Sequence, residues 1–154
     1  RVRNIIDTIT TKTVLILGRF TDERKAVLDA IREELRRRDY LPILFDFKKP
    51  AHRDLAETVS TLAHMSRFII ADITDAKSIP AELERIVPAL PSVAVQPLML
   101  RSDHDEYALF EHIKRYSSVL DVYLYDDQKM LLSNLKENVI DPAEKKAGEL
   151  TKST

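Results

Sequence analysis

Two carboxylates and two hydroxyls follow one short apolar run near the middle of the chain. Residues 67–71 read Arg-Phe-Ile-Ile-Ala, and Asp72, Thr74, Ser78 and Glu82 come after them. An apolar run of this length predicts a buried strand, and the residues after Ser78 predict a helix with Glu82 in its first turn or so. Ligands of open α/β sheets bind in the crevice beyond the carboxyl ends of the strands. We therefore expect Asp72, Thr74 and Glu82 to face such a crevice.

A second group of candidate ligand-binding residues follows the first predicted strand. This turn consists of Gly18, Arg19, Phe20 and Thr21, and it leads directly into a predicted helix. Arg19 and Thr21 could meet phosphate groups at the N-terminus of that helix. Phe20 could stack on a ligand or cover the first helix, and Arg19 could equally be an ordinary surface residue. Both interpretations stay open for these two side chains.

The same turn argues against two common kinds of site. A redox dinucleotide fold needs several glycines after its first strand, so that the pyrophosphate can approach the backbone. The chain has only Gly18 and Gly148. A two-component receiver needs an acidic pair after this strand, where Leu17 and Gly18 stand. Neither hydride transfer nor phosphoacceptor chemistry is therefore expected.

Apolar runs alternate with amphipathic segments along the chain, and this alternation predicts five strands separated by helices. The predicted strands are Thr13–Leu17, Leu41–Phe45, Phe68–Ile73, Val93–Leu100 and Val119–Tyr125. Strands joined by helices imply right-handed crossovers and a mostly parallel sheet that is covered on both faces. We predict a three-layer flavodoxin-like α/β sandwich with strand order 2-1-3-4-5. Pro42 favours an edge position for the second strand.

Composition sets limits on function. The net charge is only −1 although 32% of residues are charged, so nothing points to nucleic acid or a membrane surface. The absence of cysteine excludes disulfides, thiolate catalysis and Cys-ligated metals. The histidines form no metal-binding motif, so neither a metal nor a cofactor is expected. With no apolar run near the ~20 residues of a membrane span and no secretory signal, a cytoplasmic protein is the expectation.

The ends of the chain differ from its middle. The polar segment Arg1–Lys12 is typical of a linker, and the chain starts with Arg1 rather than Met. We expect residues 1–12 to be a linker stub from a longer protein, residues 13–150 to form one α/β domain and residues 151–154 to be a disordered tail. The sequence Asp141-Pro142-Ala143-Glu144 predicts a capped last helix with proline in its first turn.

The segment around Asp72 resembles a known family. Residues 65–72 read Met-Ser-Arg-Phe-Ile-Ile-Ala-Asp and lead to Ser78 and Glu82. This pattern resembles the third strand and following helix of Toll/interleukin-1 receptor (TIR) domains, and it is similar to the related segment of nucleoside deoxyribosyltransferases. The strand spacing over Thr13–Tyr125 is similar to theirs. In both families a glutamate of this helix acts on an N-glycosidic bond, and the resemblance implies Glu82 for that role.

The implied chemistry suits these residue types. Cleavage of a ribosyl C–N bond builds positive charge on the sugar, as in glycoside hydrolysis. An ionised Glu82, favoured near a helix N-terminus, could stabilise that charge or attack the anomeric carbon. Asp72 could bind ribose hydroxyls. From the residues alone, however, Glu82 could be an ordinary helix-start acid and Asp72 a cap of the turn that follows it.

The resemblance implies an NAD- or nucleotide-cleaving N-glycosidase, either an NAD nucleosidase or a deoxyribosyltransferase-like hydrolase. In this hypothesis Glu82 is the catalytic residue, and a nucleotide such as NAD contacts Gly18–Thr21, Asp72, Thr74 and Ser78. The alternative is a non-catalytic nucleotide-sensing or self-associating signalling module. In either case we expect a homo-oligomer that forms through the parent protein.

Overall fold

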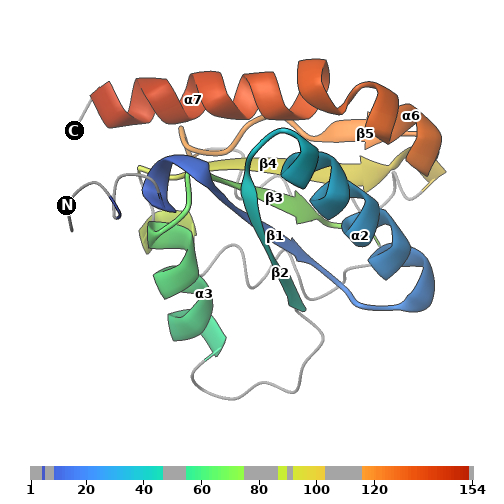
Figure 1. Cartoon of the computed structure of the whole chain (residues 1–154), viewed down its shortest axis with the longest axis horizontal. Helices are drawn as coiled ribbons and strands as arrows, with labels where there is room; N and C mark the ends of the chain where they lie inside the picture. The colour runs from blue at the N-terminus through green and yellow to red at the C-terminus, as the bar shows by residue number, and fades with distance from the viewer. Residues whose placement is uncertain are drawn as a thin grey trace.

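The computed structural model describes residue 5 and residues 9–46, 55–74, 87–89, 92–102 and 116–152. Its centre is one parallel sheet of five strands in the order β2-β1-β3-β4-β5 (Figure 1). The strands are β1 (Thr13–Gly18), β2 (Leu41–Asp46), β3 (Phe68–Asp72), β4 (Ala94–Leu100) and β5 (Tyr123–Tyr125). The predicted flavodoxin-like class, the parallel sheet and the strand order are confirmed.

Helices cover both faces of this sheet. They are α2 (Asp22–Arg37), α3 (Leu55–His64), the 3-10 turn η1 (Val87–Ala89), α6 (Gln128–Ser133), the π-helical turn η3 (Lys136–Ile140) and α7 (Asp141–Lys152). In Figure 1, α7 runs along the β4 side of the sheet and α2 lies over β1, whereas α3 lies apart from both. The helix predicted after Ser78 lies outside the described residues up to residue 86.

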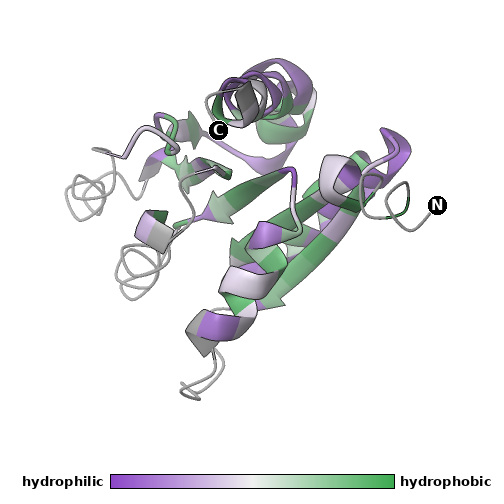
Figure 2. Ribbon diagram, turned by 90° about the vertical axis from the view of Figure 1, so that its left-hand side faces the viewer, coloured by the Kyte–Doolittle hydropathy of each residue, from purple (hydrophilic) through white to green (hydrophobic). Residues whose placement is uncertain are grey.

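The alternation of side chains along the strands divides the core in two. Val14 and Ile16 of β1 pack with α2, α6 and α7, whereas Leu15 and Leu17 pack with Val59 of α3 and its neighbours. Because both faces of β1 are buried, this strand reads as a continuous apolar run rather than an alternating one. Figure 2 shows the same arrangement, with hydrophobic residues concentrated along the strands.

β2 lies at an edge of the sheet, as Pro42 predicts. Pro42 pairs with Val14 of β1, and its missing amide hydrogen is tolerated because β1 is the only strand that pairs with β2 among the described residues. The exposed fraction of its first residue, Leu41, is 50%. β1 is therefore an interior strand, with β2 on one side and β3 on the other.

The C-terminal third departs from the prediction in two places. Val119 makes only an isolated bridge to Val95, so β5 is shorter than the predicted strand Val119–Tyr125. The helix around Pro142 does not start afresh, because residues 135–152 are helical without a break and pass through η3. Asp141 accepts a hydrogen bond from Lys136 Nζ at 3.0 Å.

The ends of the domain also carry more helix than expected. Residues 9–12, placed in the predicted linker stub, are helical and lead directly into β1. At the other end, α7 continues through Thr151 and Lys152, two residues that we expected in a disordered tail.

Candidate functional site

The carboxyl ends of β1 and β3 lie side by side and bring the turn after β1 and Asp72 to one edge of the sheet. Leu17 pairs with Ala71, so Gly18 and Asp72 both lie where their strands end. β2 lies on the other side of β1, and β4 lies on the other side of β3. The connections therefore leave in opposite directions at this point, which is the topological switch point where α/β sheets bind ligands.

Asp72 is almost completely buried at this edge, with 1% of its surface exposed. Its Oδ1 atom accepts a hydrogen bond from the Thr74 amide at 3.1 Å. This bond forms an Asx-type turn, in which Asp72 caps the turn that follows β3. Its Oδ2 atom accepts one from the Tyr125 hydroxyl at 3.3 Å and lies 3.6 Å from Arg24 Nη1. Both carboxylate oxygens therefore have protein partners.

Arg24 is the residue of this site that sequence reasoning missed. Its side chain is 8% exposed, and Nη1 donates a hydrogen bond to the Tyr125 hydroxyl at 2.9 Å. The available signal was its position in α2, because Arg24 precedes Leu28, Ile31 and Leu35 on the buried stripe of that helix. A charged residue at an apolar position requires a buried partner. Asp72 and Tyr125 are its partners here.

Burial also changes the acidity of this group of side chains. The low-polarity surroundings of Asp72 raise the pKa of its carboxyl above the ordinary value, although the hydrogen bonds from Thr74 and the charge of Arg24 oppose the increase. Burial likewise raises the pKa of the Tyr125 phenol, and the neighbouring Asp72 adds to that increase. We call Arg24, Asp72, Thr74 and Tyr125 the buried polar cluster.

Thr74 connects the buried polar cluster to β4. Its exposed fraction is 1%, and its Oγ1 atom accepts a hydrogen bond from the Leu100 amide at 3.0 Å. The Ile73 amide donates to the Leu98 carbonyl at 2.9 Å. The chain that continues toward Ser78 and Glu82 therefore leaves the sheet from a point that is held by several buried hydrogen bonds.

Close packing of α2 explains why the turn after β1 begins with Gly18. A Cβ atom on Gly18 would lie 2.8 Å from Leu28 Cδ1, so the missing side chain lets α2 pack closely against the end of β1. Arg19 and Thr21 are half-buried. Thr21 is the N-cap residue of α2 but makes no capping hydrogen bond with its side chain, while its carbonyl accepts from the Lys25 amide at 2.7 Å.

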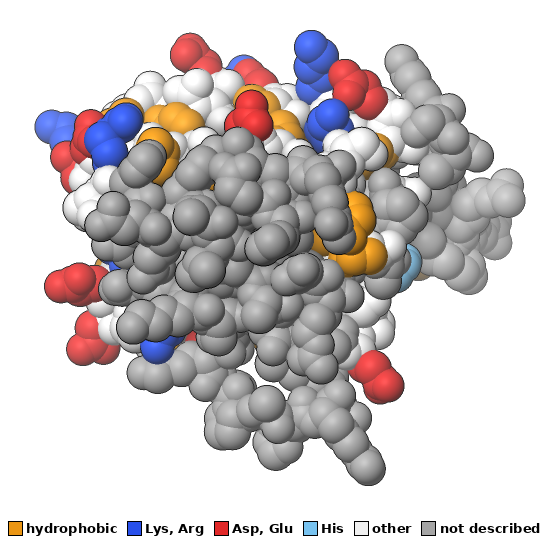
Figure 3. Space-filling view, turned by 180° about the vertical axis from the view of Figure 1, so that it is seen from behind, with side chains coloured by type: hydrophobic (Ala, Val, Ile, Leu, Met, Phe, Trp, Pro, Cys, Tyr) orange, Lys and Arg blue, Asp and Glu red, His pale blue; other side chains and the backbone are white. Residues whose placement is uncertain are grey.

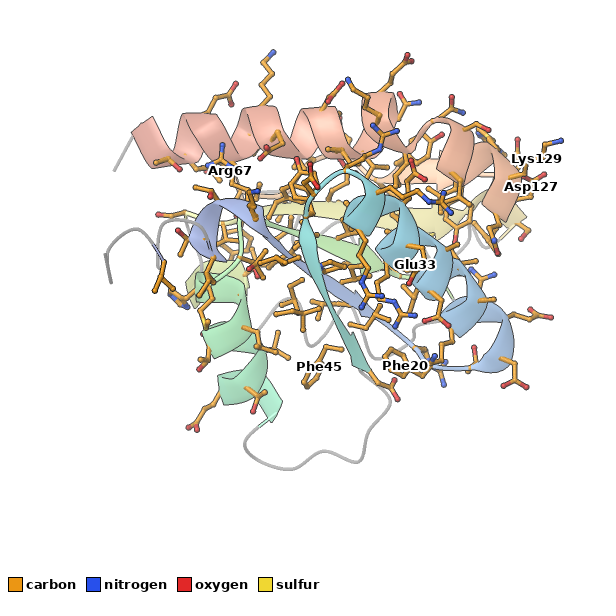
Figure 4. The ribbon with its side chains drawn as sticks, viewed as in Figure 1. Phe20, Glu33, Phe45, Arg67, Asp127 and Lys129 are labelled. Atoms are coloured by element: carbon orange, nitrogen blue, oxygen red, sulfur yellow. The ribbon has the colours of Figure 1, made fainter. Side chains whose placement is uncertain are left out.

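Phe20 belongs to both the turn and the core. Its amide donates to Asp46 Oδ1 at 3.1 Å, which ties the turn to the end of β2. Its ring packs against the core beneath α2, and Lys25 Nζ lies 5.7 Å from the ring centroid. Figure 4 shows Phe20 near the end of β2, whereas Arg67 lies at the opposite end of the sheet. Phe20 therefore packs against the core beside α2, and its contact with a ligand stays a prediction.

Ser78 and Glu82 lie outside the described residues, so their predicted roles stay predictions. Within the described ranges, no group of three or more acidic or histidine side chains could hold a metal ion. No helix in that part of the chain is long and apolar enough to cross a membrane. Figure 3 shows charged side chains of both signs around the opposite side of the molecule, in keeping with the low net charge.

These features define a flavodoxin-like α/β domain whose candidate site is the switch point between β1 and β3. In structure, the chain is similar to the TIR domains of the activated Roq1 resistosome, which directly recognises the pathogen effector XopQ. The sequence identity is 13% and the TM-score is 0.47. The match covers 93% of this chain and 85% of the other chain. No protein-family model matches the sequence, and no curated protein matches it.

Proposed function

We propose that this domain cleaves the N-glycosidic bond of NAD or a related nucleotide, with Glu82 as the catalytic carboxylate. The observation that supports this proposal best is the position of Asp72 and Thr74. They end β3 at the switch point of a parallel sheet, beside the turn that follows β1. The next residues along the chain are those that resemble the TIR and deoxyribosyltransferase helix. The segment that carries Glu82 thus starts at the edge where α/β domains bind nucleotides.

The proposal assigns different parts to the two groups of residues. Arg19 and Thr21, at the N-terminus of α2, would meet phosphate groups, and Gly18 lets Leu28 of α2 pack closely against the end of β1 behind them. Asp72 and Thr74 hold the start of the segment that carries Ser78 and Glu82, because their polar atoms are engaged in the buried polar cluster. Direct contact of Asp72 with ribose hydroxyls stays a prediction, and it would require Tyr125 to release the carboxylate.

Glu82 would act on the ribose while the bond to the base breaks. As the C–N bond to the base breaks, positive charge develops on the ribose ring. The Glu82 carboxylate would stabilise this charge or form a bond to the anomeric carbon, and water would then release the sugar product. The leaving base carries away the bonding electron pair. Nicotinamide in NAD leaves as a neutral molecule and needs no general acid.

The test is a base-release assay with NAD and with a panel of nucleosides over a wide range of protein concentration. We expect activity per molecule to rise with concentration, or on fusion to an oligomerising scaffold, because clustering raises effective concentration. Constant specific activity down to dilute monomer would show that one chain contains the complete site. The absence of turnover in every assembly state would contradict the glycosidase proposal.

One observation favours the alternative, a self-associating signalling module. Leu41 and Met65 are exposed large hydrophobic residues, and they flank the start of β1 at the edge opposite the candidate site. Exposed apolar residues of this kind would favour self-association if they form one contiguous surface. Sedimentation of the domain with Leu41→Asp and Met65→Asp tests this role, since loss of self-association with unchanged base release would separate the two functions. A cytoplasmic location stays a prediction.

A further inference from the structure

A second candidate binding site lies at the β5 edge of the sheet. A pocket of about 320 Å³ opens there between the β4–β5 edge and the C-terminal helix. Its lining includes Gln96, Leu120, Asp121, Tyr123, Asn138 and Pro142. None of these residues belongs to the switch-point site. The volume lies at the lower end of the range for small-molecule sites, about 300–1,000 Å³. We call this cavity the ladder-break pocket.

The pocket exists because the β4–β5 ladder is interrupted. Val95 pairs with Val119 and Leu98 pairs with Tyr123, so β4 advances three residues while its partner advances four. Pro97 lies inside the interruption and has no amide hydrogen to donate. The extra residue on the partner segment is a bulge, and bulges are common at sheet edges and beside functional sites.

Gln96 fills the interruption from the buried side. Its side-chain nitrogen donates to the Pro97 carbonyl and to the Asp121 carbonyl, both at 2.9 Å. These two bonds fix the orientation of the amide and use both of its N–H groups. Gln96 is 2% exposed, and among the described residues none donates to its Oε1 atom. The acceptor oxygen is therefore the hydrogen-bonding group that Gln96 has left for a ligand.

A second backbone irregularity faces the bulge. The π-helical turn η3 ends where the Asp141 amide donates to the Lys136 carbonyl, five residues earlier. Pro142 follows inside the continuous helix and cannot donate to the carbonyl of Asn138. Isolated π-turns within helices often occur at functional sites. Asn138, on this turn, is exposed and presents an amide at the mouth of the pocket.

Tyr123 adds an unexplained polar group to the wall. Its hydroxyl is buried, and no described residue supplies it with a hydrogen-bond partner. Such groups are rare in native proteins, and each calls for an explanation. A ligand seated in the pocket is one possible partner for this hydroxyl, because Tyr123 lines the pocket.

We propose that the ladder-break pocket binds a free nucleobase or a nucleoside, a planar heterocycle with an exocyclic amino group. The amino group would donate to Gln96 Oε1, and the Asn138 amide would pair with a neighbouring ring nitrogen. Leu120, Pro142 and the Tyr123 ring supply apolar surface for the faces of the heterocycle. The exposed carboxylate of Asp121 at the same pocket disfavours a phosphate. This inference does not rest on the glycosidase proposal.

The test is an NMR titration of the ¹⁵N-labelled domain with adenine, adenosine and AMP. We expect adenine to shift the side-chain amide signals of Gln96 and Asn138 and the backbone signal of Tyr123. AMP should bind to this pocket at least about fivefold more weakly than adenosine, because its phosphate is repelled by Asp121. Shifts confined to the switch-point turn at Gly18–Thr21, or no shifts at all, would overturn the proposal.

Two asparagines one helical turn apart supply a matched pair of variants. Asn138→Ala removes an amide that lines the pocket, and Asn134→Ala removes the same group from a residue that does not line it. Asn138→Ala should weaken adenine binding by about fivefold, the loss of one hydrogen bond. Asn134→Ala should change it by less than about twofold. Equal effects of the two variants on adenine binding would contradict the assignment. The folding control is the ¹H–¹⁵N spectrum of each variant without ligand, which should match that of the natural protein away from the substituted residue.

Discussion

The Nη1 atom of Arg24 lies 2.9 Å from the hydroxyl oxygen of Tyr125, a residue 101 positions further along the chain. This bond connects the first turn of α2 to the end of β5, across the carboxyl edge of the sheet. Asp72, from β3, accepts a hydrogen bond from the same hydroxyl. Three segments that are distant in sequence are thereby joined at the edge that carries the candidate site.

The Tyr125 hydroxyl should contribute measurably to stability. Tyr125→Phe leaves Arg24 without its acceptor and Asp72 without one of its donors. Buried polar groups that lose a partner cost about 1–3 kcal/mol, so we expect the free energy of unfolding to fall by about that amount. Urea denaturation at neutral pH measures the change.

Tyr123→Phe is the matched control on the same strand. The Tyr123 hydroxyl is buried but finds no partner among the described residues, so its removal should leave stability unchanged or raise it. Equal losses in the two variants would show that the effect comes from the ring environment of β5 rather than from the buried polar cluster.

Asp72 should make stability depend on pH in an unusual direction. Because the pKa of its carboxyl is raised in the folded state, the folded protein holds a proton that the unfolded chain has already released. This contribution stabilises the fold at acidic pH and is lost as pH rises from the ordinary Asp value through the raised one. Asp72→Asn removes the titration and keeps the side-chain oxygen that faces Thr74.

Urea denaturation of both proteins over a series of pH values tests this prediction. The stability of Asp72→Asn relative to the natural protein should increase as pH rises through that window. A difference that stays constant with pH, or that decreases, would mean that the pKa of Asp72 is not raised.

The two glycines should respond oppositely to alanine. Gly18→Ala places a Cβ atom 2.8 Å from the fully buried Leu28, and overpacking of this kind costs about 1–3 kcal/mol. Among the described residues, a Cβ atom on Gly148, inside α7, would meet only Arg67 Nη2, at 4.0 Å, so Gly148→Ala should stabilise the helix by about 0.5–1 kcal/mol. Thermal unfolding of both variants measures the difference. A neutral Gly18→Ala would show that Leu28 moves aside easily.

Tyr40 should affect stability at high pH. Burial, together with the charge of Glu144 and the hydrogen bond to it, raises the pKa of the Tyr40 phenol from 10.0 to about 12. The folded state therefore keeps the phenol proton after the unfolded chain has lost it, so stability should fall as pH rises from 10.0 to about 12. Tyr40→Phe should flatten this slope in denaturation curves. An unchanged slope would assign it to other groups.

The fold could be predicted from the sequence because its signals are local. The apolar runs of β1 and β3 and the proline of β2 define strands and an edge without knowledge of the partners. The shortened β5 could not be predicted in the same way. Val119 to Tyr125 has a strand-like composition, but Pro97 of the neighbouring strand interrupts the ladder, and the effect of one strand on another is not visible in either segment alone.

The candidate site was predicted less completely. The turn after β3 and its Asx-type hydrogen bond follow from the residue types Asp72 and Thr74, which are two positions apart. The partnership of Asp72 with Arg24 and Tyr125 depends on contacts between residues far apart in the chain. A lone arginine on an apolar helix stripe shows that a buried partner exists, but not which residue it is.

The most direct test of the central claim is the rate of base release by Glu82→Gln beside that of the natural protein, both held on the same oligomerising scaffold. The substitution keeps size and hydrogen bonding but removes the charge that would stabilise the developing oxocarbenium ion. Release of nicotinamide from NAD should be abolished. The free energy of unfolding should change by less than about 1 kcal/mol, since a helix-end charge contributes about 0.3–1 kcal/mol. Equal rates of nicotinamide release by the two proteins would contradict the account.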